Sequence, residues 1–324
     1  MNSLVRQAGW LPPIRRVFVC ASALLTASCP QNPLDVYNYE GNSSVVEDAA
    51  PLHIFLIGLD GWGSFSLPRA EMPVIKRMME NGAYTLAAKA VMPSRSAPNW
   101  VSMLSGVPPA LHGYTQNTAK PLFTPAITDE DGRYPNVITL LSKLRPDCAI
   151  GVFYEWEGIG DIFPVCRAAV EAQLPDLSSN RETLEPILNY IDGLRASLSF
   201  TFVHFDGADH AGHSAGYGSD AYYDMLRGLD GFVGEIEQAV RDAGLMDNAV
   251  FIISADHGGK GNDHGADTIE EREIPLILYG KNIKSGTVIP GPVDIYDIAP
   301  SIAALFGISP PTVWTGNRLP LQNP

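Results

Sequence analysis

From residue 52 onward, short runs rich in β-branched and aromatic residues alternate with longer segments of helical periodicity. The short apolar runs are typical of buried strands, and the longer pattern is typical of amphipathic helices. This alternation predicts an α/β fold, in which a mostly parallel central sheet has helices on both faces. The predicted strands are 53–59, 86–91, 149–154, 199–204, 249–254 and 275–279. The predicted helices are 72–82, 98–105, 137–143, 181–196, 219–243 and 295–306.

The first 50 residues have a different pattern. Arg15 and Arg16 precede an apolar run over 17–27 that is too short to span a bilayer. The run ends in small residues, which is typical of an export signal. We therefore expect residues 1–28 to be a signal peptide, 29–50 a polar tether and 51–324 a single folded domain. An exported protein would be periplasmic, anchored to the membrane or secreted.

The end of the export segment has two interpretations. Leu-Thr-Ala-Ser-Cys over 25–29 resembles a bacterial lipobox, in which Cys29 would carry lipid and hold the protein at the membrane. The alternative is an ordinary signal peptide that is cleaved near Ala23 or Ser28. The arginine pair also resembles a twin-arginine signal.

The sequence also leaves open whether the chain contains a disulfide. Four cysteines are too few for a disulfide scaffold. Outside the cell, however, Cys148 and Cys166 could form one disulfide. Two buried thiols are the alternative, and the spacing does not decide between them.

Composition and charge narrow the class of ligand. The chain is 45% hydrophobic and 18% charged, which excludes a disordered chain and a polytopic membrane protein. Its formal net charge of −14 makes it a poor binder of nucleic acid polymers and anionic lipid. A small phosphorylated substrate is still compatible with this charge if bound metal ions reverse the local field.

Acidic and histidine side chains follow three of the predicted strands. Because ligands gather at the carboxyl ends of parallel strands, polar groups at these positions indicate a site. Two zinc ions would require about six ligands of mixed carboxylate and imidazole type. The chain offers such a set in Asp60, Asp209, His213, Asp256, His257 and His264.

Ser96 adds a nucleophile to this set. It lies just before an apolar helical run, and Pro98 suits the first turn of a helix. A hydroxyl group at a helix N-terminus gains from the helix dipole, and a nearby metal ion would lower its pKa further.

With these residues, the sequence resembles the alkaline phosphatase superfamily, and most of all its type I phosphodiesterase/nucleotide pyrophosphatase branch. The resemblance runs from about residue 53 to 319. It rests on these motifs: Leu59-Asp60-Gly61, Ser96-Ala97-Pro98-Asn99, His112-Gly113, Asp209 through His213, Asp256-His257-Gly258, His264-Gly265, Asp297 through Ile302, and Trp314-Thr315-Gly316.

The resemblance implies a role for each site residue. Asp209, His213 and His264 would hold one zinc ion; Asp60, Asp256 and His257 would hold the other. Ser96 would contact the metal ions as the nucleophile and form a phosphoserine intermediate. Asn117, 21 residues after Ser96, would bind a phosphoryl oxygen. The expected activity is phosphodiester or pyrophosphate hydrolysis by a single catalytic domain over 51–324.

Departures from the family pattern leave the substrate open. Ser96 stands where nucleotide pyrophosphatases usually have threonine, and Ala97 replaces a frequent aromatic residue of the nucleotide pocket. Only six residues separate His257 from His264, so a long insertion found in larger members is absent. A sulfatase would need a serine and an arginine after Pro98, and the chain has Asn99 and Trp100. A phosphomonoesterase and a non-catalytic, metal-binding surface protein remain the alternatives.

The remaining polar residues near these motifs have weaker support. His53, His112 and His204 are expected to pack or to bond locally. Asp206 and Asp263 could orient ligands, but ordinary loop acids would have the same pattern.

Overall fold

The computed structural model describes residues 52–129, 132–163, 169–174, 184–194 and 198–319. The predicted signal peptide, the tether with Cys29, and Cys166 lie outside these residues, so export, lipidation and the disulfide stay predictions. Cys148 is buried, with 5% of its surface exposed. None of the helices in the described residues is both long enough and apolar enough to cross a membrane.

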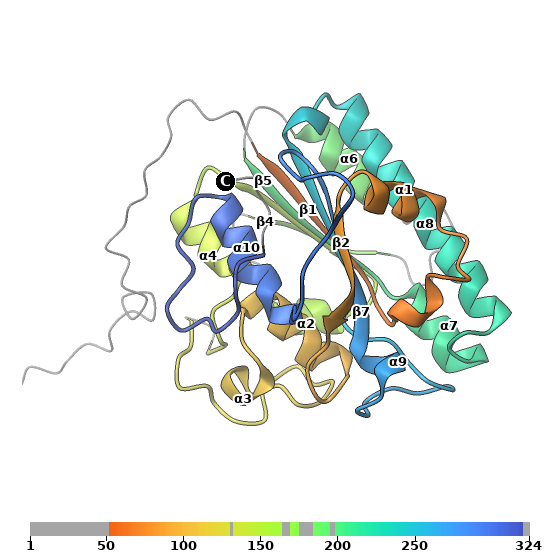
Figure 1. Cartoon of the computed structure of the whole chain (residues 1–324). Helices are drawn as coiled ribbons and strands as arrows, with labels where there is room; N and C mark the ends of the chain where they lie inside the picture. Colours follow the sequence, from red (N-terminus) through yellow and green to blue (C-terminus); the bar gives the residue numbers. More distant parts are fainter. Residues whose placement is uncertain (1–51, 130–131, 164–168, 175–183, 195–197, 320–324) are drawn as a thin grey trace, which may run out of the picture. The chain divides into compact units, whose positions relative to one another are not determined.

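A central sheet organises the described residues, with strand order β4-β3-β5-β1-β6-β7-β2-β8 (Figure 1). Neighbouring strands are parallel except around β7, which runs antiparallel to both β6 and β2. The strands are β1 (His53–Leu59), β2 (Ala83–Lys89), β3 (Ala149–Tyr154), β4 (Ala169–Gln173), β5 (Ser199–Phe205), β6 (Ala249–Ser254), β7 (Glu273–Gly280) and β8 (Thr287–Val288). The predicted α/β fold with a mostly parallel sheet is confirmed.

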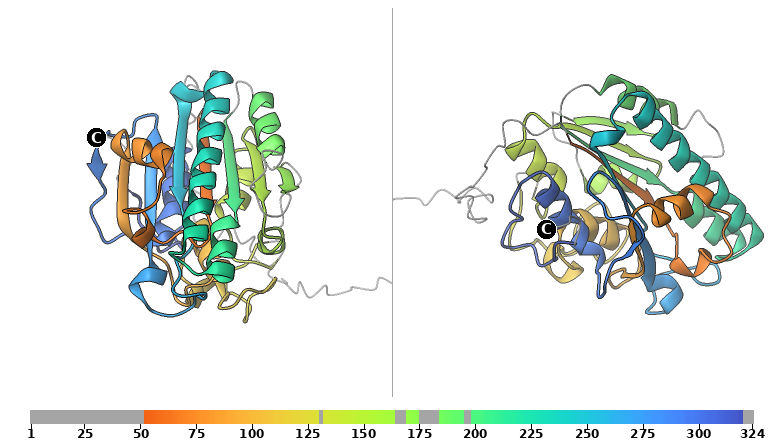
Figure 2. Two further views of the ribbon diagram at one scale, coloured as in Figure 1. Left: turned by 90° about the vertical axis from the view of Figure 1, so that its right-hand side faces the viewer. Right: turned by 45° about the horizontal axis from the view of Figure 1, so that its top comes forward.

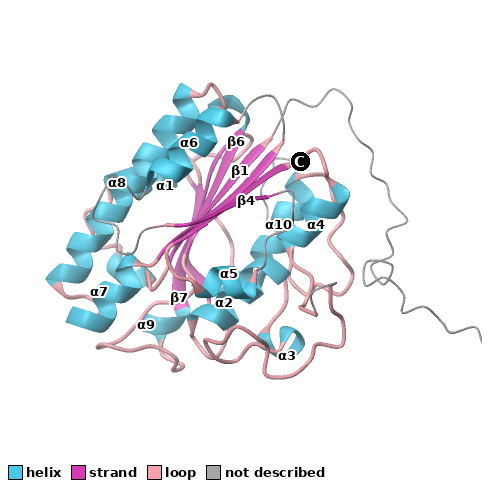
Figure 3. Ribbon diagram, turned by 180° about the vertical axis from the view of Figure 1, so that it is seen from behind, coloured by secondary structure: helices cyan, strands magenta, loops and turns pink. Residues whose placement is uncertain are grey.

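Helices cover both faces of the sheet. On one face α8 lies between α1 and α6 (Figure 2, left); α2, α4, α5 and α10 lie on the other face (Figure 3). The helices are α1 (Pro73–Glu80), α2 (Ser96–Ser105), α3 (Pro109–His112), α4 (Val137–Leu144), α5 (Gly158–Ile162), α6 (Glu185–Gly193), α7 (Gly207–Ala215), α8 (Asp220–Asp242), α9 (Ile269–Arg272) and α10 (Ile298–Leu305). Short 3-10 helices occupy Ser64–Ser66, Met246–Asn248 and Ile295–Asp297.

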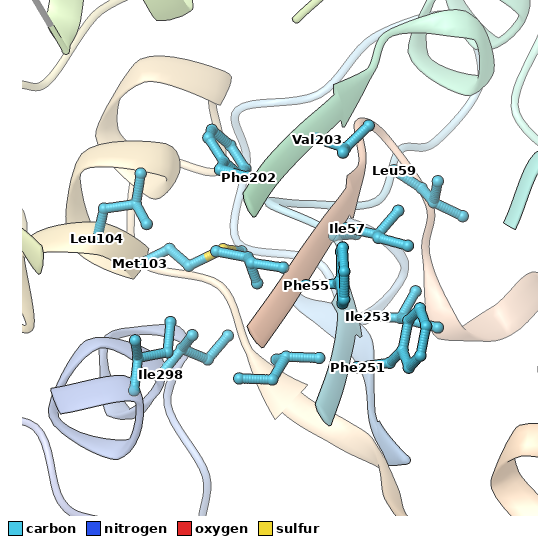
Figure 4. Close-up of a cluster of buried hydrophobic side chains, with 14 of the residues drawn as sticks. Phe55, Ile57, Leu59, Met103, Leu104, Phe202, Val203, Phe251, Ile253 and Ile298 are labelled. Carbon is cyan, nitrogen blue, oxygen red and sulfur yellow. The ribbon is translucent and has the colours of Figure 1, made fainter. Parts of the chain in front are cut away.

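The core explains why the central strands are apolar on both faces. All seven residues of β1 are buried. Figure 4 shows Phe55, Ile57 and Leu59 on one face of β1, where Phe55 stacks on Phe251 of β6 at 5.1 Å between ring centroids. Met103 of α2 lies on the opposite side of the sheet (Figure 4). Burial of this kind is the main favourable contribution to folding, and it fixes the strands whose ends carry the polar residues.

Candidate active site

The first group of ligand-type residues lies at the ends of the neighbouring strands β1 and β6. Asp60 follows β1 directly, and Asp256 and His257 follow β6. Because β1 and β6 pair in parallel, both strands end at the same edge of the sheet. One potential ligand atom from each of the three residues lies within 4.8 Å of the others. All three side chains are almost completely buried.

Hydrogen bonds orient the two carboxylates of this group. Trp100 Nε1 and His204 Nε2 each donate to Oδ2 of Asp60 at 3.0 Å. The backbone N–H of Gly61 donates to Oδ1 of Asp256 at 3.2 Å. The other oxygen of each carboxylate, Asp60 Oδ1 and Asp256 Oδ2, is buried and accepts no hydrogen bond from a described residue. Buried oxygens of this kind are costly unless a cation binds them.

The second group combines α7 with the loop after β6. Asp209 and His213 lie one turn apart on α7, a spacing that puts both side chains on one face of the helix. His264 comes from the loop between β6 and α9. Asp209 Oδ2 lies 3.3 Å from His213 Nε2, and Asp209 Oδ1 lies 3.6 Å from His264 Nε2. Here too, the ligand atoms lie within 4.8 Å of one another.

The histidines of both groups present the same nitrogen to the site. Nδ1 of His213, His264 and His257 lies 2.8, 2.8 and 2.9 Å from the backbone oxygens of Asn262, Ser94 and Gly258. A carbonyl oxygen only accepts, so each Nδ1 carries a hydrogen, and in the neutral imidazole that can bind a metal each Nε2 has a lone pair.

These lone pairs face other acceptors. His264 Nε2 lies 3.1 Å from His213 Nε2, and His257 Nε2 lies 3.1 Å from Asp256 Oδ2. Such contacts repel unless a cation or a proton lies between the atoms. The lone pairs, the unpaired carboxylate oxygens and the mixed donor set together fit divalent metal ions.

The charges of the site shift the pKa values in opposite directions. Burial raises the pKa of Asp60 to about 7 and that of Asp256 well above its ordinary value, and the negative charge of Asp209 adds to both effects. Burial alone would also raise the pKa of Asp209, but its hydrogen bond to His213 and the neighbouring histidines lower it. Burial lowers the pKa of His257 to about 3, which keeps its imidazole neutral and able to bind a metal.

A third group also satisfies the distance condition: Asp60, His204 and Asp206. In this group the 3.0 Å contact joins His204 Nε2 to the same Asp60 oxygen that Trp100 contacts. A carboxylate oxygen accepts, so His204 Nε2 carries a hydrogen and acts as a donor. His204 therefore orients Asp60, a more specific contact than the local packing expected from the sequence.

Ser96 and Asn117 lie beside the first group. Ser96 is the first residue of α2, and its Oγ lies 3.3 Å from His257 Nε2. Asn117 Nδ2 lies 3.5 Å from Ser96 Oγ, and Asn117 Oδ1 accepts from the Ala97 N–H at 3.0 Å. The Asn117 side chain is thereby anchored with its amide donor directed at the hydroxyl group.

Ser96 and Asn117 belong to backbone segments that differ in burial. All ten residues of α2 are buried. Asn117 instead lies in a loop that the Leu122 N–H closes by donating to the Gly113 carbonyl at 2.8 Å. Most of the residues between Gly113 and Leu122 are exposed or only partly buried.

A buried glutamate holds the loops that carry the site, and sequence reasoning missed it. Glu271 Oε2 accepts from Ser94 Oγ at 3.0 Å and from the backbone N–H groups of Gly265 and Ala266. Its Oε1 accepts from Thr268 Oγ1 at 3.1 Å. One carboxylate therefore joins the loop before Ser96 to the loop that carries His264. In the sequence it lies within the charged run Glu270 to Glu273, which gives no signal of a buried role.

The structure thus brings all the predicted site residues together, and their roles stay predictions. One expectation changes in detail, because Asp209 lies on α7 rather than at the end of β5. α7 is rich in glycine, alanine and histidine, so its sequence has no apolar periodicity that would predict a helix.

Curated relatives cover the chain only in part. The bis(5'-adenosyl)-triphosphatase enpp4 of Mus musculus is 24% identical over 237 residues, which are 69% of this chain and 50% of the relative. The arylsulfatase K of Danio rerio is 33% identical over 92 residues, which are 27% of this chain and 18% of the relative. The chain thus matches at most about half the length of these two relatives.

Solved structures share the fold at low identity. Murine ectonucleotide pyrophosphatase/phosphodiesterase 5, in complex with AMP, superposes with a TM-score of 0.64 at 14% identity. The match covers 80% of this chain and 96% of that protein. The 2-O GAG sulfatase BT1596 superposes with a TM-score of 0.66 at 14% identity and covers 83% of this chain and 73% of the sulfatase.

A family model decides the membership. The family described as type I phosphodiesterase / nucleotide pyrophosphatase matches residues 54–136 and 165–281, which together are more than half of the chain. These segments include every predicted site residue, from Asp60 to His264. The chain therefore belongs to the type I phosphodiesterase / nucleotide pyrophosphatase family.

Proposed function

We propose that this protein is a metal-dependent phosphoric ester hydrolase that cleaves small phosphodiesters or pyrophosphates with Ser96 as nucleophile. One observation carries the proposal: Ser96 Oγ begins a buried helix and lies 3.3 Å from His257, within one of two carboxylate–histidine groups. Family membership supports this class of activity. The acidic chain argues against a nucleic acid polymer as substrate.

In this proposal each group holds one divalent ion. Asp209, His213 and His264 hold the first; Asp60, Asp256 and His257 hold the second, with Ser96 beside it. Zinc is the proposed metal, because imidazole and carboxylate ligands in small sets suit it. Bound ions would lower the pKa of the Ser96 hydroxyl and of a water molecule, and would offset the charge on the phosphoryl oxygens.

The residues of the chain then carry two displacements. Ser96 Oγ gives up its proton to solvent and attacks phosphorus. The bond to the leaving oxygen breaks, and the electron pair leaves on that oxygen, which departs as phosphate or takes a proton from water and departs as an alcohol. Water next attacks the phosphoserine from the side opposite Ser96, which frees the serine and releases the phosphate product. Asn117 donates from Nδ2 to a phosphoryl oxygen in both steps, and its contact with the Ala97 N–H fixes that orientation.

A phosphodiester is favoured over a phosphomonoester by the residue that faces the nucleophile. Asn117 is neutral and contacts Ser96 Oγ at 3.5 Å. An arginine at that position would better offset the second charge of a monoester dianion. Rates on bis-(4-nitrophenyl) phosphate and on 4-nitrophenyl phosphate distinguish the two substrates.

Sulfatases occur among the relatives and the solved structures with this fold, but the residues around Ser96 do not favour sulfate esters. Asn99 occupies the position after Pro98, and its amide Nδ2 donates to the carbonyls of Val91, Pro93 and Arg95. Asn99 therefore braces the loop before the nucleophile. Assaying 4-nitrophenyl sulfate alongside the phosphate esters tests this assignment.

The test is hydrolysis of bis-(4-nitrophenyl) phosphate by wild type and Ser96→Ala, each chelated and then supplied with zinc. We expect activity that requires zinc and that Ser96→Ala loses. A Ser96→Ala protein that kept full activity would rule out the serine mechanism. A folded, zinc-loaded wild type that cleaved neither phosphate ester would favour a non-catalytic, metal-binding protein.

A further inference from the structure

Arg95 precedes the nucleophile directly, and none of the described residues pairs with its side chain. It immediately precedes α2, with extended backbone angles (φ −125°, ψ 156°). Its side chain is half-buried. Within the part of the chain that the structure describes, no hydrogen bond or ion pair forms to its guanidinium group. Five N–H donors are therefore available at the edge of the site.

The position of the guanidinium group is defined by Gly265. A Cβ atom built on Gly265 would lie 3.2 Å from Cζ, Nε and Nη2 of Arg95, so the group rests closely over this residue. Gly265 also has a φ of +119°, which disfavours residues with a side chain. Gly265 follows His264, so the guanidinium group lies beside the loop that carries this member of the second group.

Two other cationic side chains, those of Lys260 and Arg272, already have partners. Arg272 donates to the Ala90 carbonyl at 3.0 Å and pairs with Asp267 at 2.9 Å. Lys260 pairs with Glu270 at 3.0 Å. Arg95 thus differs from these neighbours in having its donors free for an anion, and guanidinium groups suit phosphate because two N–H groups can bind one anion.

In-line displacement puts this arginine on the leaving-group side. Ser96 Oγ contacts His257, a member of the first group. In a two-metal phosphoryl site, the attacking and leaving oxygens occupy opposite sides and are clamped by different ions. The leaving oxygen would therefore lie towards His264 and its partners, where the guanidinium group of Arg95 is.

We propose that Arg95 binds a negatively charged leaving group, and that it selects phosphoanhydrides over esters of uncharged alcohols. This inference rests on the proposed function and specifies its substrate. In the reaction, Ser96 Oγ loses its proton to solvent, its bond to phosphorus forms and the anhydride P–O bond breaks. The electron pair stays on the departing phosphate oxygen, whose phosphoryl group Arg95 holds.

The test compares two substrates that share one half. ATP and the 4-nitrophenyl ester of AMP both transfer an adenylyl group, but only the leaving group of ATP carries phosphate charges before the bond breaks. For Arg95→Met we expect the ratio of kcat/KM on ATP to kcat/KM on the ester to fall roughly 10- to 100-fold, as for a lost charge-assisted hydrogen bond. Arg95→Lys should recover part of the ratio. Arg227→Met removes an exposed, paired arginine from α8 and should leave the ratio unchanged.

Binding to an inactive protein keeps the two proposals separate. In the Ser96→Ala background, Arg95→Met should weaken ATP binding roughly 10- to 100-fold more than ester binding, measured by calorimetry. Equal weakening of both ligands, or none, would overturn the role of Arg95 whatever the turnover results are. Conversely, full turnover by Ser96→Ala would overturn the serine mechanism and leave the binding result standing.

Discussion

His204 donates from Nε2 to Oδ2 of Asp60 at 3.0 Å, and both side chains are almost completely buried. The bond turns the other oxygen, Oδ1, towards His257, whose Nε2 lies 3.6 Å away. A donor behind a ligand fixes its orientation, and losing such a donor typically costs about 10- to 100-fold in metal affinity.

The first prediction concerns this donor. We expect His204→Ala to weaken zinc binding by roughly 10- to 100-fold. His204→Gln, whose amide can donate from a similar position, should retain most of the affinity. Competition with a chromophoric chelator measures both. Equal affinity in wild type and His204→Ala would show that Trp100 alone orients Asp60.

The second prediction concerns Glu271. Glu271→Ala would leave several donors of the 94 and 264–268 loops without an acceptor, and each costs about 1–3 kcal/mol when buried. We expect a drop of about 3 kcal/mol in the free energy of unfolding, together with weaker zinc binding, because Ser94 also holds His264 Nδ1. Denaturant unfolding measures the first effect.

Its matched control is the preceding residue. Glu270 is partly exposed and pairs with Lys260 on the surface. Such pairs contribute little, so Glu270→Ala should leave both stability and zinc binding nearly unchanged. Similar losses in the two variants would mean that charge near the loop matters, and not the hydrogen bonds of Glu271.

The third prediction concerns metal removal and pH. In the chelated protein, burial raises the pKa of Asp60 to about 7, well above its ordinary value. Between about pH 4 and pH 7 the folded chain therefore holds a proton that the unfolded chain has lost, so the stability of the chelated protein falls as pH rises through this window. His213 acts in the same direction at higher pH, because Asp209 raises its pKa to about 9.

A bound zinc ion would displace the protons from Asp60 and His213 and offset the repulsion between the buried carboxylates. The gap in unfolding free energy between zinc-loaded and chelated protein should accordingly widen from pH 5 to pH 8. Denaturant titrations of both forms across this range test it. A gap that stays constant or narrows would contradict the assignment of the buried carboxylates as metal ligands.

The fourth prediction concerns a histidine outside the site. His112 Nδ1 accepts from the Tyr114 N–H at 3.1 Å, so Nε2 donates to Ser102 Oγ at 2.9 Å. Burial lowers the pKa of His112 to about 3. Below pH 6.5 this histidine binds a proton in the unfolded chain but stays neutral in the folded chain. Acidification therefore lowers the free energy of unfolding, by about 2 kcal/mol at pH 5. His112→Asn, which keeps the acceptor for Tyr114, should lose less stability between pH 7 and pH 5 than wild type; an identical slope would refute it.

The sequence predicted best what depends on local pattern. β1, β3 and β6 have the predicted bounds, because continuous apolar runs mark strands that are buried on both faces. β4 was not predicted, since Ala169–Gln173 contains polar residues and pairs with β3 alone at the edge of the sheet. β8 has only two residues and leaves no pattern.

The site also contains residues that local sequence pattern predicts and residues that it does not. Metal-ligand residue types at strand ends indicated the two groups before the structure was known. The roles of Glu271 and His204 could not be assigned in this way, because the contacts that define them, with Ser94 and Asp60, join residues more than 140 positions apart in sequence. Arg95 is an ordinary surface residue type, and only the structure shows its donors lying free over Gly265. Such roles depend on tertiary contacts that one sequence does not reveal.

The difference in burial between α2 and the Asn117 loop predicts that the two halves of the site differ in hydrogen exchange. Amide hydrogens of a wholly buried helix exchange with solvent only when the whole fold opens, whereas those of an exposed loop exchange through local motion. The backbone of the exposed residues around Asn117 should therefore exchange faster than that of α2, whose first residue is Ser96. Because the nucleophile belongs to the slowly exchanging helix, its hydroxyl group would need no rearrangement before each attack.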